Sequence, residues 1–174
     1  ELVIPEGVVQ LNNGAFSGMS GIRSLQLGSH VNYIYSNNPE AFYNMTALEE
    51  VVFPGATVPV LSHSSSPFSS LKSLNWVLVP NASYEQYLAK FASYLPGGAR
   101  IGMLDNSEEF IVRDGVLVLY QGKAAEVVIP EGVTAIGPYA FYNNTQITKV
   151  TVPGSVTAIN RYAFGKCTAL TEVE

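Results

Sequence analysis

The side chains that most often carry covalent chemistry are scarce in this sequence, and none stands in a recognisable catalytic arrangement. Cys167 is the only cysteine, and the one basic residue beside it, Lys166, is expected to point away from it. Nothing in the sequence therefore lowers the pKa of the thiol, as a nucleophilic thiolate requires. We expect Cys167 to be buried and structural, and a single cysteine excludes an internal disulfide.

One of the two histidines, His63, lies in a serine-rich stretch from Ser62 to Ser66, which raises the question of Ser-His hydrolytic chemistry. No nucleophile elbow and no acidic residue that could orient the imidazole is recognisable around it, so a polar loop is the better interpretation. The other histidine, His30, stands in an expected turn and is interpreted as solvated. We predict that the chain is not an enzyme and that it holds no cofactor.

Acidic and hydroxyl side chains at alternating positions could bind calcium at Asp105, Ser107 and Glu109. A calcium loop needs a glycine at its sixth position, where this chain has Phe110, so the pattern fails. We therefore predict no metal site. The polar run 105–109 is interpreted as a linker.

The charge balance excludes some classes of partner. The chain has 9 Lys and Arg against 14 Asp and Glu, a net charge of -5, and no run of like charges. Nucleic acid is not expected as a partner, because phosphate binding needs clustered Lys and Arg. No apolar run approaches the ~20 residues of a transmembrane helix, so we expect no membrane insertion within this sequence. It begins and ends inside repeats, and we expect it to be part of a longer protein.

A repeated phrase in the segment 127–164 supplies the framework for the whole chain. Its recurring residues are 23 positions apart: Pro130 and Pro153, Ile136 and Ile159, Ala140 and Ala163, Phe141 and Phe164. A fixed period of this size indicates a solenoid, in which each repeat is one turn of chain stacked on the next. The chain of 174 residues is long enough for such a stack to bury a sizeable core.

Each repeat opens with two apolar residues that alternate with other residues before a proline, for which Gly28 substitutes once. These pairs are Leu2 and Ile4, Leu25 and Leu27, Val51 and Phe53, Val77 and Val79, Val127 and Ile129, Val150 and Val152. Alternation at period two predicts a strand with one buried face. One short strand per turn then builds a parallel sheet, and the proline, which cannot donate to the ladder, ends each strand.

Phenylalanines recur later in the repeats, at Phe16, Phe42, Phe68, Phe141 and Phe164. We expect their rings to form one inner column, and burial of each contributes ~1.5–3 kcal/mol. The first two steps are 26 residues rather than 23 because of insertions at 35–39 and 60–66. We expect both insertions to bulge as loops, since loop length costs little entropy.

Two segments interrupt the repeats. Residues 83–94 are predicted to form a helix that caps the first block, because apolar residues recur at helical spacing and Ser83 with Gln86 fits a capping box. Residues 100–104 are expected to add one irregular strand. Asp114-Gly115 between two β-rich runs predicts a hairpin over 110–120.

The predicted organisation is therefore two blocks. The first, residues 1–104, is a repeat block ending in the capping helix. The second, residues 105–174, is the hairpin followed by further repeats, and it is left open whether the two blocks stack coaxially.

The phrase Val-x-Ile-Pro-x-x-Val-x-x-Ile-x-x-x-Ala-Phe, which ends at Phe141 and nearly recurs up to Phe164 with Cys167 three residues later, resembles the BspA-type leucine-rich repeat of bacterial surface proteins. The segments 79–84 and 109–117 also resemble recurrent parts of that family. The departures are Gly28, Phe53 and the two lengthened repeats. The resemblance implies a mainly β, right-handed leucine-rich-repeat solenoid with short parallel strands, displayed on or secreted from a bacterial cell. It also implies protein binding or adhesion without enzymatic activity.

The residues between the inward pairs should point outward, and they are our candidate protein-binding residues. They form two rows along the sheet: Gln26, Val52, Leu78, Val128 and Thr151, and Glu50, Trp76 and Glu126. Val52, Trp76, Leu78 and Val128 are apolar for solvent-facing positions, and an apolar patch with polar neighbours often marks an interaction surface. Trp is a frequent hot-spot residue, so we predict that Trp76 and Leu78 anchor a protein ligand, such as a host extracellular-matrix or cell-surface protein.

Other interpretations of this row stay open. β-branched residues simply favour strands, and the predicted helix could cover Trp76. The chain could also be a structural spacer of a larger surface protein, with no ligand of its own.

Tyrosines are plentiful, and several are expected on turns or on the convex side: Tyr33, Tyr35, Tyr43, Tyr139, Tyr142 and Tyr162. They could make a surface that contacts carbohydrate or protein. They could equally cover hydrophobic flanks of the solenoid, and this is the interpretation we favour from the sequence.

Overall fold

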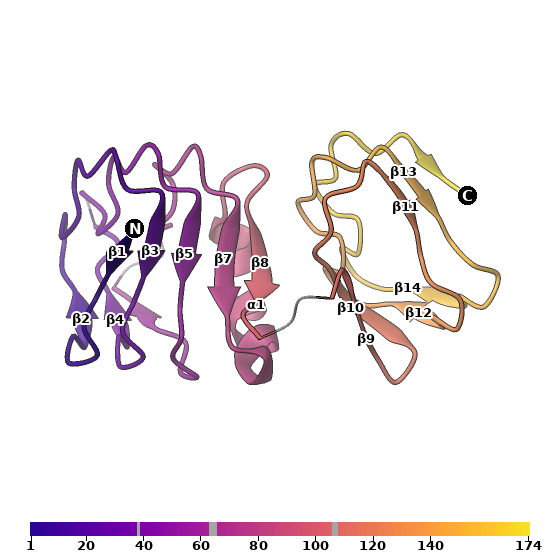
Figure 1. The fold of residues 1–174 in the computed structure, drawn as a ribbon, viewed down its shortest axis with the longest axis horizontal. Helices are drawn as coiled ribbons and strands as arrows, with labels where there is room; N and C mark the ends of the chain where they lie inside the picture. The colour runs from indigo at the N-terminus through magenta and orange to yellow at the C-terminus, as the bar shows by residue number, and fades with distance from the viewer. Residues whose placement is uncertain (38, 63–65, 106–107) are drawn as a thin grey trace. The chain divides into compact units, whose positions relative to one another are not determined.

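The chain folds into two compact units, which divide between residues 106 and 107 (Figure 1). The structure is a computed structural model that describes residues 1–37, 39–62, 66–105 and 108–174. His63 with Ser64 and Ser65, and Ser107 of the rejected calcium pattern, lie outside these ranges. Both units consist of short, mainly parallel strands stacked turn upon turn, which confirms the mainly β solenoid.

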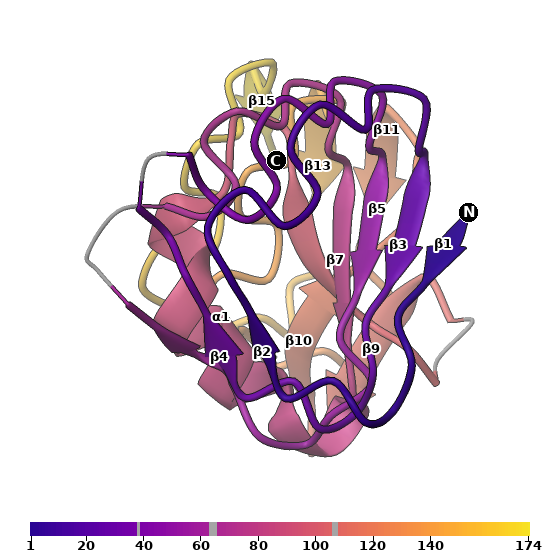
Figure 2. The ribbon, with the colours of Figure 1, turned by 90° about the vertical axis from the view of Figure 1, so that its left-hand side faces the viewer.

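The main sheet of unit 1 takes one strand from each successive turn. In spatial order its parallel strands are β1 (Leu2–Val3), β3 (Ser24–Gln26), β5 (Glu50–Val52), β7 (Trp76–Val79) and β8 (Arg100–Met103). A second parallel sheet consists of β2 (Gln10–Leu11), β4 (Tyr33–Ile34) and β6 (Val60–Leu61), and Figure 2 shows β2 and β4 apart from the main sheet. Both lengthened repeats keep their strands in register. Val60 and Leu61, which the sequence analysis assigned to the second insertion, are not part of a loop but form strand β6 and pair with β4.

The parallel register places equivalent residues of successive turns side by side. Leu25 pairs with Leu2 on one side and Val51 on the other, and Val51 pairs in turn with Val77. Leu25, Val51 and Val77 are fully buried, so they form the inward row that the alternation predicts. Gly28 has a physical reason to replace proline, because a Cβ there would lie 2.6 Å from the carbonyl oxygen of Pro5. Only glycine fits where the two turns approach so closely.

Three of the five phenylalanines, Phe16, Phe42 and Phe68, stack in a column inside unit 1, whereas the prediction was a single column through all five. The ring centroids of Phe16 and Phe42 are 6.1 Å apart and those of Phe42 and Phe68 are 6.0 Å apart, with nearly parallel rings. The backbone supports this column, since the Phe16 N–H donates to the carbonyl of Ala41 at 2.9 Å. Phe42 and Phe68 are fully buried, and Phe16 at the end of the column is half-buried.

A helical segment links β7 to β8 in the last turn of unit 1. It consists of η1 (Asn81–Ser83), α1 (Tyr84–Phe91) and η2 (Ala92–Tyr94). The predicted capping box is wrong, because Ser83 makes no capping hydrogen bond and its backbone has φ −109° and ψ 3°. The Ser83 hydroxyl instead donates to the carbonyl of Ala56 at 2.7 Å. The hydroxyl therefore ties the helical segment to a neighbouring turn, not to its own backbone.

The helix continues the aromatic core. Phe91 follows Phe68 by 23 residues, and the two ring centroids are 5.4 Å apart in an edge-to-face contact. Phe53 contacts both Phe91, at 5.5 Å, and Tyr87, at 5.6 Å. The Tyr87 hydroxyl donates to the carbonyl of Gly55 at 2.9 Å, and burial raises the pKa of Tyr87, which keeps it protonated as a donor. Phe53, which directly follows β5, is thus the residue on which the helix packs.

Unit 2 repeats this plan with fewer turns. Its main sheet is parallel and consists of β11 (Glu126–Val128), β13 (Lys149–Thr151) and β15 (Glu172–Val173). Its second sheet has the spatial order β14 (Ala158–Ile159), β12 (Ala135–Ile136), β10 (Val116–Tyr120) and β9 (Phe110–Arg113). β9 and β10 form the predicted hairpin, and both turn residues have positive φ, 49° at Asp114 and 77° at Gly115. This combination is that of a type I′ turn.

The aromatic column of unit 2 extends beyond the repeats into the hairpin. Phe141 stacks on Phe164 at 4.9 Å, and Tyr120 continues the column on the other side of Phe141 at 5.1 Å. Phe110 then contacts Tyr120 at 5.0 Å. The hairpin therefore closes one end of this core with its own aromatic rings.

Truncating a ring in the middle of a column should cost far more than truncating one at its end. We expect Phe42→Ala to lower the free energy of unfolding by about 3–5 kcal/mol, because the ring is fully buried between two others. Phe16→Ala is the matched control and should cost clearly less, since Phe16 is half-buried and stacks on one side. Urea denaturation of both variants measures the difference, and equal losses would contradict the column.

Candidate functional site

The outward side of the main sheet of unit 1, called here the sheet face, carries two rows of side chains in register. One row is Ser24, Glu50, Trp76 and Arg100, and the other is Gln26, Val52, Leu78 and Gly102. Parallel strands lie about 4.8 Å apart, so neighbours within a row touch. The structure thus brings together the five unit 1 candidates Gln26, Glu50, Val52, Trp76 and Leu78 on one surface.

Trp76 packs on β8, the strand after its own. The guanidinium carbon of Arg100 lies 5.3 Å from the centroid of the indole, a cation–π contact. Arg100 is only 6% exposed, so this contact is largely shielded from water. A Cβ at Gly102 would lie 2.9 Å from Leu78 Cδ2 and 3.0 Å from Trp76 Cε3. The missing side chain at Gly102 is therefore what lets Trp76 and Leu78 lie over β8.

Val52 is a correction to the sequence interpretation. We expected it to face solvent as part of the apolar row, but it is only 9% exposed. It pairs with Gln26 on one side and with Leu78 on the other, and these longer side chains cover it. Trp76, Leu78, Gln26 and Glu50 are half-buried. The accessible apolar surface is therefore narrower than predicted and is centred on Trp76 and Leu78.

Polar side chains border this centre. The Ser24 hydroxyl donates to Glu50 Oε1 at 3.3 Å. At the start of the same strands, Arg23 Nη1 lies 3.2 Å from Glu49 Oε1. Exposed pairs of this kind contribute little to stability, but they hold two carboxylates at the edge of the sheet face.

The three unit 2 candidates lie on a different kind of surface. Val128 is 68% exposed, Glu126 is exposed, and the Thr151 hydroxyl donates to Glu174 at 3.3 Å. Between them, Lys149 Nζ lies 2.9 Å from Glu172 and 2.6 Å from Glu174. Hydrogen bonds to these carboxylates raise the pKa of Lys149, and its ammonium lowers the pKa of Glu174. On the outward side of this sheet, Lys149, Glu172 and Glu174 are therefore paired with one another.

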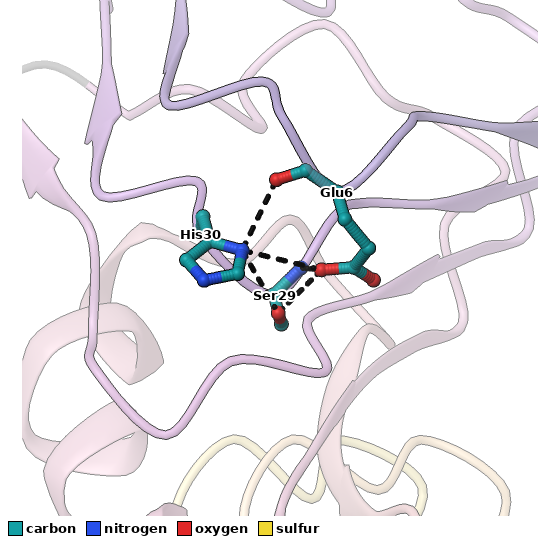
Figure 3. Close-up of polar contacts among 3 residues, drawn as sticks. All are labelled: Glu6, Ser29 and His30. Carbon is teal, nitrogen blue, oxygen red and sulfur yellow. Dashed lines mark hydrogen bonds and ion pairs between the residues drawn. The ribbon is translucent and has the colours of Figure 1, made fainter.

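Serine, histidine and a carboxylate do meet at one place, which the sequence analysis missed. In Figure 3 the Glu6 carboxylate reaches Ser29 of the next turn, and both the backbone N–H, at 2.8 Å, and the hydroxyl of Ser29 donate to Glu6 Oε2. His30 Nδ1 lies 3.3 Å from the Ser29 hydroxyl, 3.1 Å from the Glu6 carbonyl and 3.4 Å from Glu6 Oε2. The 23-residue spacing of Glu6 and Ser29 is the signal that could have revealed this contact.

This arrangement is not that of a hydrolytic triad. A triad places the imidazole between the hydroxyl and the carboxylate, with a different ring nitrogen facing each. Here the hydroxyl donates directly to the carboxylate, and a single nitrogen, His30 Nδ1, faces every partner. The His30 and Glu6 side chains are 68% and 64% exposed, so water is not excluded. The trio acts as a brace between two turns, and the hydrogen bonds from Ser29 lower the pKa of Glu6.

The described ranges also bear on metal binding and on membrane insertion. Among those residues, no group of three or more His, Cys, Asp and Glu side chains is placed to hold a metal ion. None of the helices within them has the length and apolar character to cross a membrane. Cys167 is half-buried, and its thiol donates to the carbonyl of Phe141 at 3.0 Å.

The repeats, their register and their aromatic columns match a known sequence family. A family model described as the BspA type leucine rich repeat region matches residues 1–92 and 118–174 in six copies. The chain belongs to the BspA-type leucine-rich repeat family. This is a family of bacterial surface proteins, so the chain is a repeat module of that kind. A search of curated protein sequences found no match.

Three crystal structures are similar to this BspA-type chain over 99% of its length. They are a leucine-rich cell surface protein of Faecalibacterium prausnitzii A2-165 (20% identity, TM-score 0.39), the pneumococcal vaccine antigen PcpA (16%, 0.42) and a leucine-rich repeat protein of Eubacterium ventriosum (14%, 0.37). The chain spans 59%, 49% and 59% of their respective lengths.

The brace at Glu6 should make the stability of unit 1 depend on pH. The pKa of Glu6 is lowered from its ordinary value of 4.5, so its contribution is fully present above pH 4.5 and is lost as the pH falls through the lower, folded-state value. We expect Glu6→Gln to lower the melting temperature at neutral pH and to have progressively less effect below pH 4.5. Thermal melts of both proteins across the acid range measure this, and a pH-independent difference would contradict it.

The space over Gly102 can be tested with the chain's single tryptophan. We expect Gly102→Ala to displace the indole, to shift its fluorescence emission, and to cost about 1–3 kcal/mol of stability, as overpacking does. Gly21→Ala is the control, since a Cβ there meets nothing within 4 Å. Unchanged emission in Gly102→Ala would show that the indole does not depend on this glycine.

Proposed function

We propose that the chain is a non-enzymatic binding module of a bacterial surface or secreted protein, and that it holds a protein ligand against the sheet face of unit 1. The observation that carries this proposal is the pair Trp76 and Leu78, half-buried on the outward side of the sheet over Gly102. Outward positions of a solvated sheet are normally polar. A tryptophan held there by the sheet itself favours contact with another molecule.

The arrangement has the anatomy of a protein-binding surface. Hot spots are enriched in Trp and Arg, lie in water-shielded places, and are bordered by polar groups of lower energetic weight. Trp76 with the buried Arg100 supplies such a centre. Glu49 and Glu50, held by Arg23 and Ser24, supply the border. The acidic border favours a ligand with basic groups around an apolar contact.

The packing of Trp76 also favours affinity. Its contact with Arg100 and its position over Gly102 restrict the indole before any ligand arrives. A side chain that is already ordered loses less entropy on binding than a mobile one. Gln26 is close enough in the adjoining row to add a hydrogen bond at the edge of such a contact.

Glu126, Val128 and Thr151 are the matching outward residues of unit 2, and we propose that they add a second, more polar contact area. Their exposure makes them accessible to a ligand. The anchor is placed on unit 1 because Lys149, Glu172 and Glu174 of the unit 2 sheet are already paired with one another. A host extracellular-matrix or cell-surface protein is the ligand class that we propose.

We expect Trp76→Ala to weaken binding of the full chain to its protein ligand by about 30-fold, the effect of removing a hot spot worth roughly 2 kcal/mol. Surface plasmon resonance against purified matrix and epithelial surface proteins measures this, and the emission of the sole tryptophan should shift during the same titration. Glu50→Lys, at the border, should weaken binding without disturbing the core. Val60→Ala, an exposed residue of the second sheet, is the control.

Two outcomes would contradict this function. If no protein in such a panel binds saturably, the chain is a spacer rather than a binder. If a saturable ligand is found but Trp76→Ala and Glu50→Lys bind it as the unchanged chain does, the ligand uses another surface.

A further inference from the structure

The turns that follow the second sheet of unit 2 bring three tyrosines together. Tyr139 contacts Tyr142 with ring centroids 5.1 Å apart, and it contacts Tyr162 of the next turn at 5.4 Å. A cation lies over each end of this row: the guanidinium carbon of Arg161 is 4.8 Å from the ring of Tyr162, and Lys166 Nζ is 5.4 Å from that of Tyr142. These five residues, called here the tyrosine cluster, form a continuous surface.

The cluster does not belong to the hydrophobic core. Tyr162 is 52% exposed, Tyr139 and Tyr142 are half-buried, and both cations are exposed. The core beneath consists of the aromatic column and its neighbours, and none of the three tyrosines is part of it. The rings therefore present area to solvent, which goes against the interpretation, favoured from the sequence, that they only cover flanks.

The backbone of the cluster is strained in a way that the fold does not require. Tyr139 and Tyr162 have φ of 60° and 55°, the left-handed region that bulky side chains disfavour. The first repeat has Gly14 at the equivalent position, with φ 63°. Lys166 is also left-handed, with φ 58°, where the first repeat has Gly18. Glycine would satisfy the fold at these positions, and strain kept without a structural need points to function.

A glycine also makes room for the cluster. A Cβ on Gly165 would lie 3.0 Å from Tyr142 Cδ2 and 3.2 Å from Tyr162 Cβ. The bare backbone at Gly165 lets the ring of Tyr142 pack against the following turn. The two turns thus hold the three rings and two cations in one fixed arrangement.

The charge of this surface is opposite to that of the chain. The two segments that form it, 137–145 and 160–168, contain Arg161 and Lys166 but no Asp or Glu, in a chain of net charge -5. Exposed rings offer flat apolar faces, and Arg binds oxyanions such as carboxylate and sulfate through paired hydrogen bonds to two oxygens. A ligand for this surface needs ring-shaped apolar faces together with anionic groups.

We propose that the tyrosine cluster binds an acidic saccharide. The apolar faces of its sugar rings stack on the tyrosines, and its carboxylate or sulfate groups pair with Arg161 and Lys166. This site is distinct from the sheet face, because its residues belong to unit 2 and those of the sheet face belong to unit 1. Two cations are few for a nucleic acid, whose binding depends on many phosphate contacts.

The test is isothermal titration calorimetry of the full chain with three probes: a sulfated hexasaccharide, a uronic-acid hexasaccharide and a neutral hexasaccharide. We expect one or both acidic probes to bind with a dissociation constant below about 1 mM, more weakly as salt is raised, and the neutral probe to bind far less. Comparing the two acidic probes distinguishes sulfate from carboxylate recognition. Tyr162→Gly should weaken binding about tenfold while the melting temperature holds or rises, because glycine relieves the strained backbone.

Arg161→Gln with Lys166→Gln should remove most of the salt-dependent affinity. Tyr43→Ala is the matched control, since Tyr43 follows Phe42 as Tyr142 follows Phe141 and it is an exposed tyrosine of unit 1. Absence of binding to both acidic probes would overturn the proposal, as would binding that Tyr162→Gly leaves unchanged. Equal binding of a single-stranded oligonucleotide would also overturn it, because the surface would then respond to charge and flat rings without requiring a sugar polymer.

Discussion

Both proposed binding surfaces of this protein depend on the register between successive turns. Backbone hydrogen bonds fix each strand against its counterpart, and one aromatic ring per turn stacks on the next. Residues 23 or 26 positions apart become neighbours through this register: Glu6 and Ser29, Glu50 and Trp76, Tyr139 and Tyr162. A slip of one residue would turn the inward row outward. It would bury the sheet face and separate Glu6 from Ser29. These surfaces therefore form only when the turns stack in their native register.

The repeat period was enough to predict the strands, the two faces and the phenylalanine columns, because these features recur at fixed spacing. The ends of the columns could not be predicted, because there the chain departs from the repeat. Tyr120 comes from a hairpin. Phe91 comes from helix α1, which lies between β7 and β8, where the earlier turns have a strand of the second sheet. Ser83 shows the same limit: its local sequence fits a helix cap, yet its hydroxyl bonds to another turn, a contact that local pattern cannot reveal.

The candidate site was predictable in outline but not in its energetics. Alternation placed Trp76 and Leu78 outward, and the strands agree. Alternation cannot say how much of an outward side chain its neighbours cover, which is why the burial of Val52 was missed. The alternation pattern also could not predict that Arg100 and Gly102 lie beside Trp76 and Leu78. Both residues lie in β8, the strand after the helix, where the repeat is interrupted. These two residues determine how the indole is held.

The stacking of turns also determines how each unit responds to a pull. The hydrogen bonds of each main sheet run between neighbouring turns, so they lie along the stacking direction of the unit. Since each turn contacts only the turns on either side of it, a pull along that direction strains the hydrogen bonds between every pair of neighbouring turns, and an end turn can detach while the remaining turns stay paired. A unit of this kind is therefore expected to unfold by losing one turn after another from its end. A sandwich of long antiparallel strands would instead unfold in a single step.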